Sequence, residues 1–253
     1  RVKKINSLEK INKSKEVSIL TNARCLTEGV DIPSLDSVAF ISPKRSTVDI
    51  IQATGRAIRL TKPRGTGFII VPFFIEKDNL DEIDEKKLKS NYKYIFNILG
   101  ALKEHDNILS DIIDELRIEL GKKKVTTRGK LPAKIIINIP IDVPSNFEDK
   151  ITTMIVENTT DDWLEKYGLL KSIEDKKGTI KHINQDSIID NINIGDHIRW
   201  VRIRYKNNML SKKRIQMYES LKGWYWTGED QLFKRNYERC VAYGEEHGNL
   251  NIK

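Results

Sequence analysis

The stretch SVAFISPKRSTVDIIQATGRAIRLTKPRGTGFIIVPFFI, residues Ser37–Ile75, decides the fold of the first part of this chain. It opens with a short apolar run that stops at Pro43, as a strand does. Ser46 or Thr47 then offers a side-chain oxygen as the N-cap of a helix. The almost continuously apolar run Gly65–Ile75 follows, as expected of a strand that is covered on both faces. Strand, helix and strand in this order predict an α/β domain with a parallel sheet.

The flanking segments extend this pattern. EVSIL, residues Glu16–Leu20, is typical of one more strand, and a helical stripe with a break near EHDN runs through residues 95–120. Gly121 stands where a C′ residue would stop the second of these helices. We expect a basic linker at 121–130 and a β-rich connector in AKIIINIPIDVP, residues 133–144. The stripe consists of Ile95, Ile98, Leu99, Leu102, Leu109, Ile112, Ile113, Leu116 and Leu120.

The helix within the opening stretch carries an unusual set of polar groups. Gln52, Arg56 and Arg59 stand at i, i+4 and i+7, which places them on one helical face. Gly55 lies among them, although glycine weakens a helix. Taken alone, this pattern fits either a solvated basic face or a group of side chains that meets an anion.

The loop before this helix is NARCLTEGVDIPSLDSV, residues Asn22–Val38. It follows a predicted strand, where α/β proteins place ligand-binding loops. Gly29 permits a close approach of the backbone, and Asp31 offers a carboxylate beside it. On spacing alone, an ordinary connection between strands remains the simpler interpretation.

The C-terminal third contains an internal repeat of aromatic residues and glycine. WLEKYGLL, which begins at Trp163, has aromatic residues at i and i+4, and Gly178 follows 15 residues after the tryptophan. FKRNYERC, which begins at Phe233, repeats the spacing, with Gly248 again 15 residues on. A fixed period of this kind indicates a duplicated small unit. The chain ends about 20 residues into the second copy, so we expect it to be a piece of a longer protein.

Composition narrows the kind of partner. The 253 residues carry a formal net charge of +8 and a pI near 9.2, which favours a polyanion, most often nucleic acid. Cys25 and Cys240 form no spaced pair, so we infer neither a disulfide framework nor a zinc site. No apolar run reaches membrane length and no signal peptide heads the chain, so we expect no membrane partner.

NARCLTEGVDIP followed by QATGRAIR resembles motifs V and VI of superfamily 2 helicases, which lie in the second of two RecA-like domains. Trp163 and IGDHIRWVRIRYKNNMLSKKRIQMYESLKGWYW resemble the helicase-associated domain, a small three-helix module of bacterial and viral helicases. The resemblance implies a partial RecA-like α/β domain with a parallel sheet, followed by a small all-α helicase-associated domain. It also implies a cytoplasmic or nucleoid-associated protein of bacterial or viral origin.

The resemblance divides the chain into four parts. Residues 1–120 would be the second RecA-like domain with trailing helices, and 121–160 the linker and connector. Residues 161–229 would be a helicase-associated domain, and 230–253 the start of a second repeat. His197 and Asn208 stand where this module often has tryptophan and glycine. We expect His197 to fill a core position and Asn208 to adopt the left-handed turn that glycine would.

The resemblance also assigns roles in ATP hydrolysis. Arg56 and Arg59 match the arginines that reach the phosphates, one of them as an arginine finger. The other matched residues are Gly29, Asp31 and Gln52 at the nucleotide and Thr21 and Thr27 at the nucleic-acid backbone. Neither a phosphate-binding G-x-x-x-x-G-K-[ST] loop nor a DEAD-like acidic box occurs in these residues. We therefore expect a first RecA-like domain of the same protein as a partner. ATP and Mg²⁺ would be used by the full-length enzyme, and this piece alone would bind neither and would be inactive.

The second expected site is a basic face in the C-terminal module. Cations around an aromatic core suit contacts to a nucleic-acid backbone, although a solvated helix surface is the alternative. The candidate residues are Arg199, Arg202, Arg204, Lys206, Lys212 and Lys213. We expect the large aromatic residues to form the core that so small a module needs. These are Trp163, Tyr167, Trp200, Trp224 and Trp226.

The sequence thus predicts the C-terminal part of an ATP-dependent DNA helicase or translocase of superfamily 2. Two alternatives remain open: a non-catalytic nucleic-acid-binding protein, and the motor subunit of a restriction-type system. The preference for DNA over RNA comes from the resemblance and from no particular residue.

Overall fold

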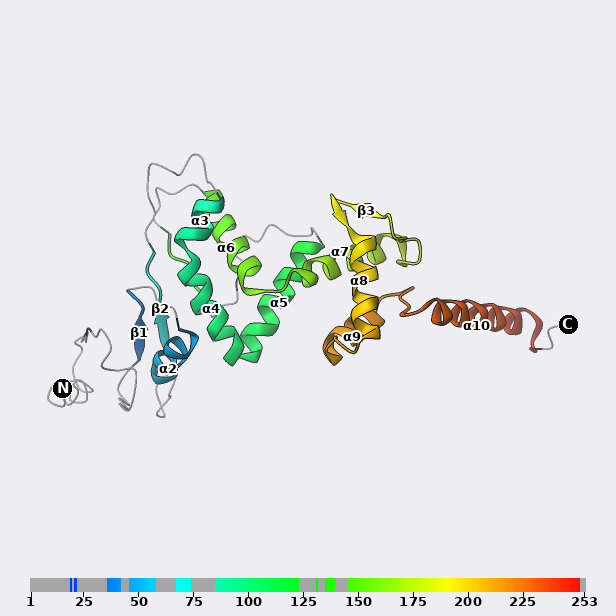
Figure 1. Cartoon of the computed structure of the whole chain (residues 1–253), viewed down its shortest axis with the longest axis horizontal. Helices are drawn as coiled ribbons and strands as arrows, with labels where there is room; N and C mark the ends of the chain where they lie inside the picture. Colours follow the sequence, from blue (N-terminus) through cyan, green and yellow to red (C-terminus); the bar gives the residue numbers. More distant parts are fainter. Residues whose placement is uncertain are drawn as a thin grey trace. The chain divides into compact units, whose positions relative to one another are not determined.

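The computed structural model of this chain describes residues 19, 21, 36–41, 46–57, 67–73, 85–122, 131, 135–139 and 145–250. At 47, 56, 57, 85–87, 145 and 146 it describes the backbone alone. The chain divides into two compact units, Arg1–Leu116 with Thr127–Asp161 and Arg117–Thr126 with Asp162–Lys253. Most of their helices and strands are labelled in Figure 1.

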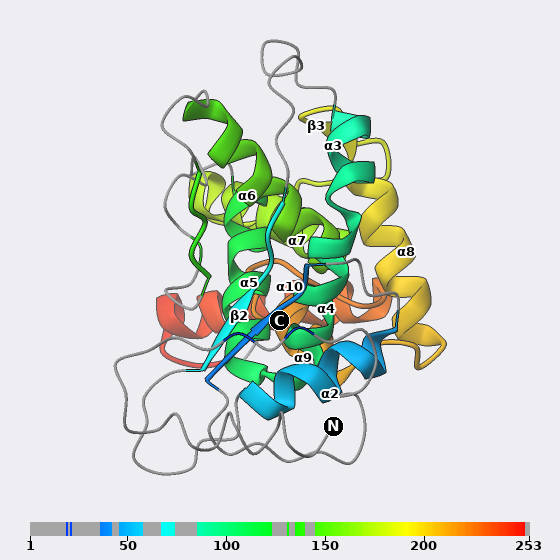
Figure 2. The ribbon, with the colours of Figure 1, turned by 90° about the vertical axis from the view of Figure 1, so that its left-hand side faces the viewer.

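The first unit contains two parallel strands joined through a helix. β1, Ser37–Ala39, pairs with β2, Phe68–Ile70. α2, Thr47–Ala57, lies between them in sequence and next to both in space (Figure 2). Ser46 caps α2, because its Oγ accepts a hydrogen bond from the backbone N–H of Asp49 at 3.4 Å. The predicted strand–helix–strand unit and its parallel pairing are confirmed. The strand predicted at 16–20 lies outside the described residues apart from Ile19, which is exposed and belongs to no strand.

The prediction that the second strand is covered on both faces is wrong. Phe68 and Ile70 are 55% and 51% exposed, whereas Ile69 between them is partly buried. Ile69 packs with the buried residues Ile50 of α2 and Ile98 of α4, so within the described ranges helices cover one face only. An unbroken apolar run is compatible with either arrangement, because the run itself does not specify which layers pack on it.

The helices that follow complete the first unit. They are α3 (Glu85–Asn91), α4 (Lys93–His105), α5 (Asn107–Gly121) and α6 (Ser145–Thr159). The end of α5, from Arg117 on, belongs to the second unit. α4 packs against both α2 and α6. The predicted break falls at Asp106, whose Oδ1 accepts a hydrogen bond from the backbone N–H of Leu109 at 2.9 Å. The predicted apolar stripe is confirmed in its buried members Ile95, Ile98, Leu109 and Ile113.

The connector before α6 is not β-structure in the residues that are described. Residues 135–139 form no strand. Ile137 and Ile139 pack against the cluster that contains Phe96 and Ile151, while Ile136 is 74% exposed. The segment therefore alternates inward and outward as a strand would, but no neighbouring strand among the described residues pairs with it, and an alternating pattern does not supply such a partner.

The second unit is helical apart from one small hairpin. Its helices are α7 (Asp162–Lys177), α8 (Ile194–Lys206), α9 (Lys212–Glu219) and α10 (Gly228–His247). β3, Ile188–Ile189, pairs antiparallel with β4, Ile192–Asn193. The expectation of an all-α module is therefore corrected. Asp190 and Asn191 both have positive φ, of 53° and 62°, as a tight two-residue hairpin turn requires.

The core of the second unit gathers residues from α7, α8 and α9 and from the turn after α9. Tyr218 and Trp224 are almost fully buried in it. Glu174 of α7 fixes the turn, because its carboxylate accepts hydrogen bonds from the backbone N–H of Lys222 and from Lys171 Nζ, both at 2.8 Å. Burial raises the pKa of Glu174, but these hydrogen bonds outweigh that effect and leave its pKa below the usual value. The buried carboxylate therefore stays charged and paired.

Gly121 does not have the role that the sequence predicted for it. It is the last residue of α5 rather than a C′ residue beyond it. A Cβ at this position would lie 1.9 Å from the backbone oxygen of Glu165 in α7. The glycine is therefore required for the close approach of α5 to α7, and not for a left-handed turn.

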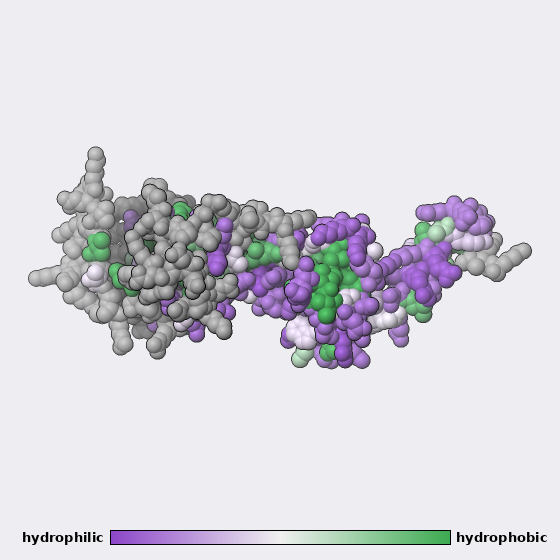
Figure 3. All heavy atoms as spheres, turned by 90° about the horizontal axis from the view of Figure 1, so that it is seen from above, coloured by the Kyte–Doolittle hydropathy of each residue, from purple (hydrophilic) through white to green (hydrophobic). Residues whose placement is uncertain are grey.

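The internal repeat is visible as two helices with the same ending. α7 and α10 both stop immediately before a glycine with positive φ, of 73° at Gly178 and 69° at Gly248. The paired aromatic rings near their starts, Trp163–Tyr167 and Phe233–Tyr237, have centroids 6.4 Å apart in each case. Their surroundings differ, because α10 contains no buried residue and its apolar side chains form green spots along the helix at the right of Figure 3.

Candidate nucleotide and nucleic-acid sites

α2 presents one side to the core and the other to solvent. Ile50 and Thr54 are 1% and 3% exposed, and the Thr54 hydroxyl donates to the backbone oxygen of Ile51. Gln52 is exposed on the other side of the helix. A Cβ at Gly55 would meet no atom within 4 Å. The outer side of α2 is therefore open at Gln52, the first residue of the set Gln52, Arg56 and Arg59 that the sequence places on one face.

Position 56 follows Gln52 by one helical turn and so shares its side of α2. The side chain of Arg56 is not described, and Arg59 lies outside the described residues. The same holds for Thr27, Gly29 and Asp31 of the predicted loop. Thr21 is described as an exposed residue outside any helix or strand.

α8 has a buried and an exposed side that follow its helical period. Ile194, Ile198 and Val201 are buried in the core of the second unit. The helix is capped by Asn193, whose side-chain oxygen accepts from the backbone N–H of Asp196 at 3.0 Å. The exposed side chains on this helix are Asp196, Arg199, Trp200, Ile203 and Lys206.

Two of the predicted cations on α8 are engaged with aromatic rings. Arg202 donates from Nε to the backbone oxygen of Tyr225 at 2.9 Å, and its guanidinium lies 4.0 Å from the centroid of that ring. Arg202 therefore joins α8 to the turn after α9. Arg204 lies 4.4 Å from the ring centroid of Trp200, one helical turn before it. Arg199 and Lys206 are exposed without such a ring contact among those described.

The start of α9 concentrates positive charge. Ser211 caps the helix by accepting from the backbone N–H of Arg214 at 3.3 Å. Lys212 and Lys213 occupy the first two helical positions and are exposed. Cations are unfavourable at this end of a helix, by roughly 0.3–1 kcal/mol each, because the exposed backbone N–H groups there are already positive. An anion bound at this position would reverse the sign of that interaction.

Asn208, between α8 and α9, has φ 55°, which confirms the left-handed turn predicted for it. His197 is also confirmed as a core residue, at 7% exposed. Its Nε2 and the hydroxyl of the buried Tyr218 are 2.9 Å apart and form a hydrogen bond. Burial lowers the pKa of His197 to about 4 and raises the pKa of Tyr218 above its usual value. Both groups are neutral at pH 7, and the pair belongs to the core rather than to a binding site.

The expected aromatic core is confirmed for four of its five members and wrong for Trp200. Tyr167 and Trp224 are buried, and Trp163 and Trp226 pack against the same cluster. Trp200 is 46% exposed. The spacing could have revealed this, because Trp200 lies two residues after the buried Ile198 and is therefore on the opposite side of α8.

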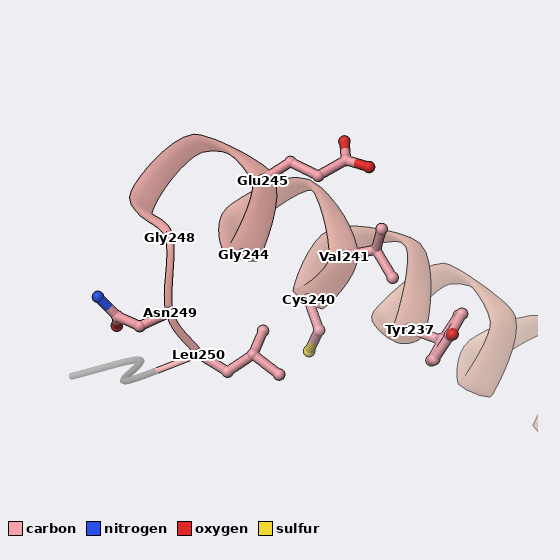
Figure 4. Close-up of a pocket in the computed structure, with 8 residues that line it drawn as sticks. All are labelled: Tyr237, Cys240, Val241, Gly244, Glu245, Gly248, Asn249 and Leu250. Atoms are coloured by element: carbon pink, nitrogen blue, oxygen red, sulfur yellow. The ribbon is translucent and has the colours of Figure 1, made fainter.

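The C-terminal end of α10 forms a shallow groove. Leu250 returns beneath the helix on the side of Cys240, beyond the turn at Gly248 (Figure 4). A Cβ on Gly244 would lie 3.1 Å from Cδ2 of Leu250, so the small residue allows this return. The groove is lined mainly by apolar atoms, and its lining residues include Tyr237, Cys240, Val241 and Leu250.

Within the described ranges, no group of three or more His, Cys, Asp or Glu side chains is arranged so as to hold a metal ion. None of the helices that the structure describes has the length and apolar character needed to cross a membrane.

Comparisons with known proteins connect the first unit to helicases. Residues 2–61 match the family described as the helicase conserved C-terminal domain. The protein named "Probable helicase A859L", from Kenyan and Malawian isolates of African swine fever virus, is 39% identical over 69 residues, which are 26% of this chain and 8% of the viral protein. This chain therefore spans less than a tenth of the viral relatives that it matches.

A solved structure, "ATP-dependent Type ISP restriction-modification enzyme LlaBIII bound to DNA", is similar over 96% of this chain and 17% of its own. The identity is 23% and the TM-score is 0.45. That likeness is too distant to bear on function. The match over residues 2–61 is the informative one, because it covers the predicted loop, β1 and α2.

Proposed function

We propose that this chain, whose residues 2–61 carry the conserved C-terminal domain of a superfamily 2 helicase, supplies one half of the ATP site of a nucleic-acid motor. In this proposal Arg56 and Arg59 contact the phosphates of ATP, and one of them is the arginine finger. Gly29, Asp31 and Gln52 contribute to the nucleotide side of the same cleft, and Thr21 and Thr27 contact the nucleic-acid backbone.

The observation that carries the proposal is the agreement between the family match and the position of Gln52. The match ends at residue 61 and so includes the whole of QATGRAIRL. α2 turns Gln52 away from a core that is filled by Ile50 and Thr54. A side chain that faces outward from a helix packed beside a parallel sheet is available to a second domain or a ligand.

The chemistry fits guanidinium groups at these positions. Phosphoryl transfer develops charge on the equatorial oxygens of the γ-phosphate, and a fixed arginine neutralises it. Lysine would replace these residues poorly, because it lacks the planar pair of donors and the permanent charge of arginine. The phosphate-binding loop and the Mg²⁺ carboxylate would come from a first RecA-like domain, and closure of the two domains would complete the site. ATP bound there would supply the free energy for movement along the nucleic acid.

We further propose that the second unit is a helicase-associated module that binds the nucleic acid, DNA in preference to RNA. α8, α9 and the turn between them contain seven Lys and Arg residues and two acidic residues. Arg199, Lys206, Lys212 and Lys213 are exposed and suited to phosphate contacts. The unfavourable position of Lys212 and Lys213 at the start of α9 supports this role, because a bound phosphate would offset the repulsion.

The test of the ATP site measures ATP hydrolysis by the longer protein that we propose contains this chain, with and without DNA. Arg56→Ala and Arg59→Ala are compared with the wild type and with Arg64→Ala, an arginine outside the motif. The variant that removes the arginine finger should lower the DNA-stimulated rate by about three orders of magnitude or more. Wild-type turnover in both motif variants would show that the arginine-finger assignment is wrong.

A further inference from the structure

Trp200 is a half-exposed tryptophan that lies near one cationic and one aromatic side chain of its own helix. The side chain is 46% exposed on the outer side of α8, although tryptophan has more apolar surface to bury than any other residue. The Arg204 guanidinium lies 4.4 Å from the ring centroid, one helical turn after Trp200, and the centroid of the His197 ring lies 6.5 Å from it, about one turn before. The chain thus presents a flat, half-exposed apolar ring beside a cation.

The charges around this ring limit the kind of partner that it can bind. Arg199 precedes Trp200 directly, Arg204 lies one helical turn after it, and the exposed Asp196 lies one turn before it. Lys206 is exposed farther along the same helix, so cations outnumber carboxylates around the ring. Such a surface favours an anionic partner over another basic or neutral protein face. An anionic polymer that also carries flat, apolar, stackable groups is a nucleic-acid strand with unpaired bases.

We propose that Trp200, beside Arg204, is a stacking platform for an unpaired nucleobase, so that the second unit binds single-stranded segments through a base as well as through phosphates. This inference rests on the nucleic-acid-binding role proposed above and goes beyond it, because backbone contacts alone require no exposed aromatic ring. Tryptophan has only two side-chain torsion angles, so little side-chain freedom is lost on stacking.

The base-stacking site makes no use of the groove on α10 or of the apolar side chains along that helix. It also makes no use of the buried pair of His197 and Tyr218. The binding energy would come from the exposed indole and the guanidinium beside it.

The experiment measures the affinity of the 253-residue chain for two fluorescein-labelled strands of equal length, an oligothymidylate and a strand of abasic sugar-phosphate units. Both strands have the same phosphate charge, and only the first has bases. The variants are Trp200→Ala, Trp200→Leu, which keeps apolar bulk but not a flat ring, and Trp200→Phe. Ile203→Ala removes an equally exposed apolar side chain of the same helix as a control.

Trp200→Ala and Trp200→Leu should weaken binding to oligothymidylate by roughly 5- to 150-fold and leave binding to the abasic strand unchanged. Trp200→Phe and Ile203→Ala should bind both strands nearly as the wild type does. Equal losses on the two strands, or no loss on oligothymidylate for the leucine variant, would overturn the stacking proposal. Failure of the wild-type chain to bind either strand would instead overturn the nucleic-acid-binding role on which it rests.

Discussion

Gly121 of α5 and Gly168 of α7 contact each other's helices reciprocally. A Cβ on Gly121 would lie 1.9 Å from the backbone oxygen of Glu165, and a Cβ on Gly168 would lie 2.0 Å from the backbone oxygen of Ile118. Each glycine thus lies against the carbonyl group of the residue that stands three positions before the other glycine. The two backbones therefore approach each other with no side chain between them at these two positions.

This contact predicts that Gly168→Ala destabilises the second unit by roughly 3 kcal/mol, because one of the two helices must move to admit a methyl group. The measurement is denaturant unfolding followed by tryptophan fluorescence, since all four tryptophans lie in this unit. Gly228→Ala is the control, because a Cβ there would meet no atom within 4 Å. Similar midpoints for Gly168→Ala and the wild type would contradict the contact.

The buried His197 predicts a pH dependence of stability. Its pKa is about 4 in the folded chain and 6.5 without burial, so the unfolded chain binds the proton more readily between these values. The free energy of unfolding is therefore highest above about pH 6.5 and declines as the pH falls toward 4. The contribution of His197 that is lost over this range totals about 3 kcal/mol. His197→Phe removes the titrating group. Between pH 6.5 and 4 the wild type should lose more unfolding free energy than this variant does, and parallel curves would refute the prediction.

Replacement of Gly55 should change the stability of α2 and the rate of ATP hydrolysis in opposite directions. Because nothing packs within 4 Å of its position, Gly55→Ala should stabilise α2 by roughly 0.5–1 kcal/mol. If the outer side of α2 closes onto ATP and a first domain, the same change should lower DNA-stimulated ATP hydrolysis in the longer protein. Gly100→Ala in α4 is matched in openness, and should stabilise without loss of activity. Equal activity in the two variants would argue against close approach at Gly55.

The lysines at the start of α9 predict a salt effect. Replacing Lys212 and Lys213 together with alanine should lower the slope of log affinity against log salt concentration for a single strand by roughly 1.4, if each meets one phosphate. Lys176 and Lys177, at the end of α7, are exposed lysines of the same unit and provide the matched double variant. An identical slope in the α9 variant and the wild type would exclude phosphate contacts by these two lysines.

The parts of the fold that the sequence predicted correctly depend on local rules. Ser46 caps α2 because a hydroxyl before a helix satisfies a free backbone N–H, and the break at Asp106 follows the same rule. Asn208 adopts its turn because its own short side chain tolerates it. Such features are specified by a few neighbouring residues.

The parts that the sequence did not predict depend on what packs against them. The exposed faces of Phe68 and Ile70, the absence of a strand at residues 135–139 and the contact at Gly121 are set by neighbours distant in sequence. Trp200 was misplaced because large aromatic residues in a small module are usually buried, whereas the helical period around Ile198 places it outside. The positions Arg56 and Arg59 follow from the motif alone, since no described contact of their side chains supports them.

The likeness of α10 to α7 has a consequence for folding. α10 repeats the aromatic spacing and the terminal glycine of α7, but Glu238 occupies the position that corresponds to Gly168. A glutamate there would collide with the carbonyl of Ile118, where even a methyl group does not fit. α10 could therefore not take the place of α7 on α5 with the same backbone contact. The residue at this one position thus distinguishes two helices that are otherwise alike in aromatic spacing and in their terminal glycine.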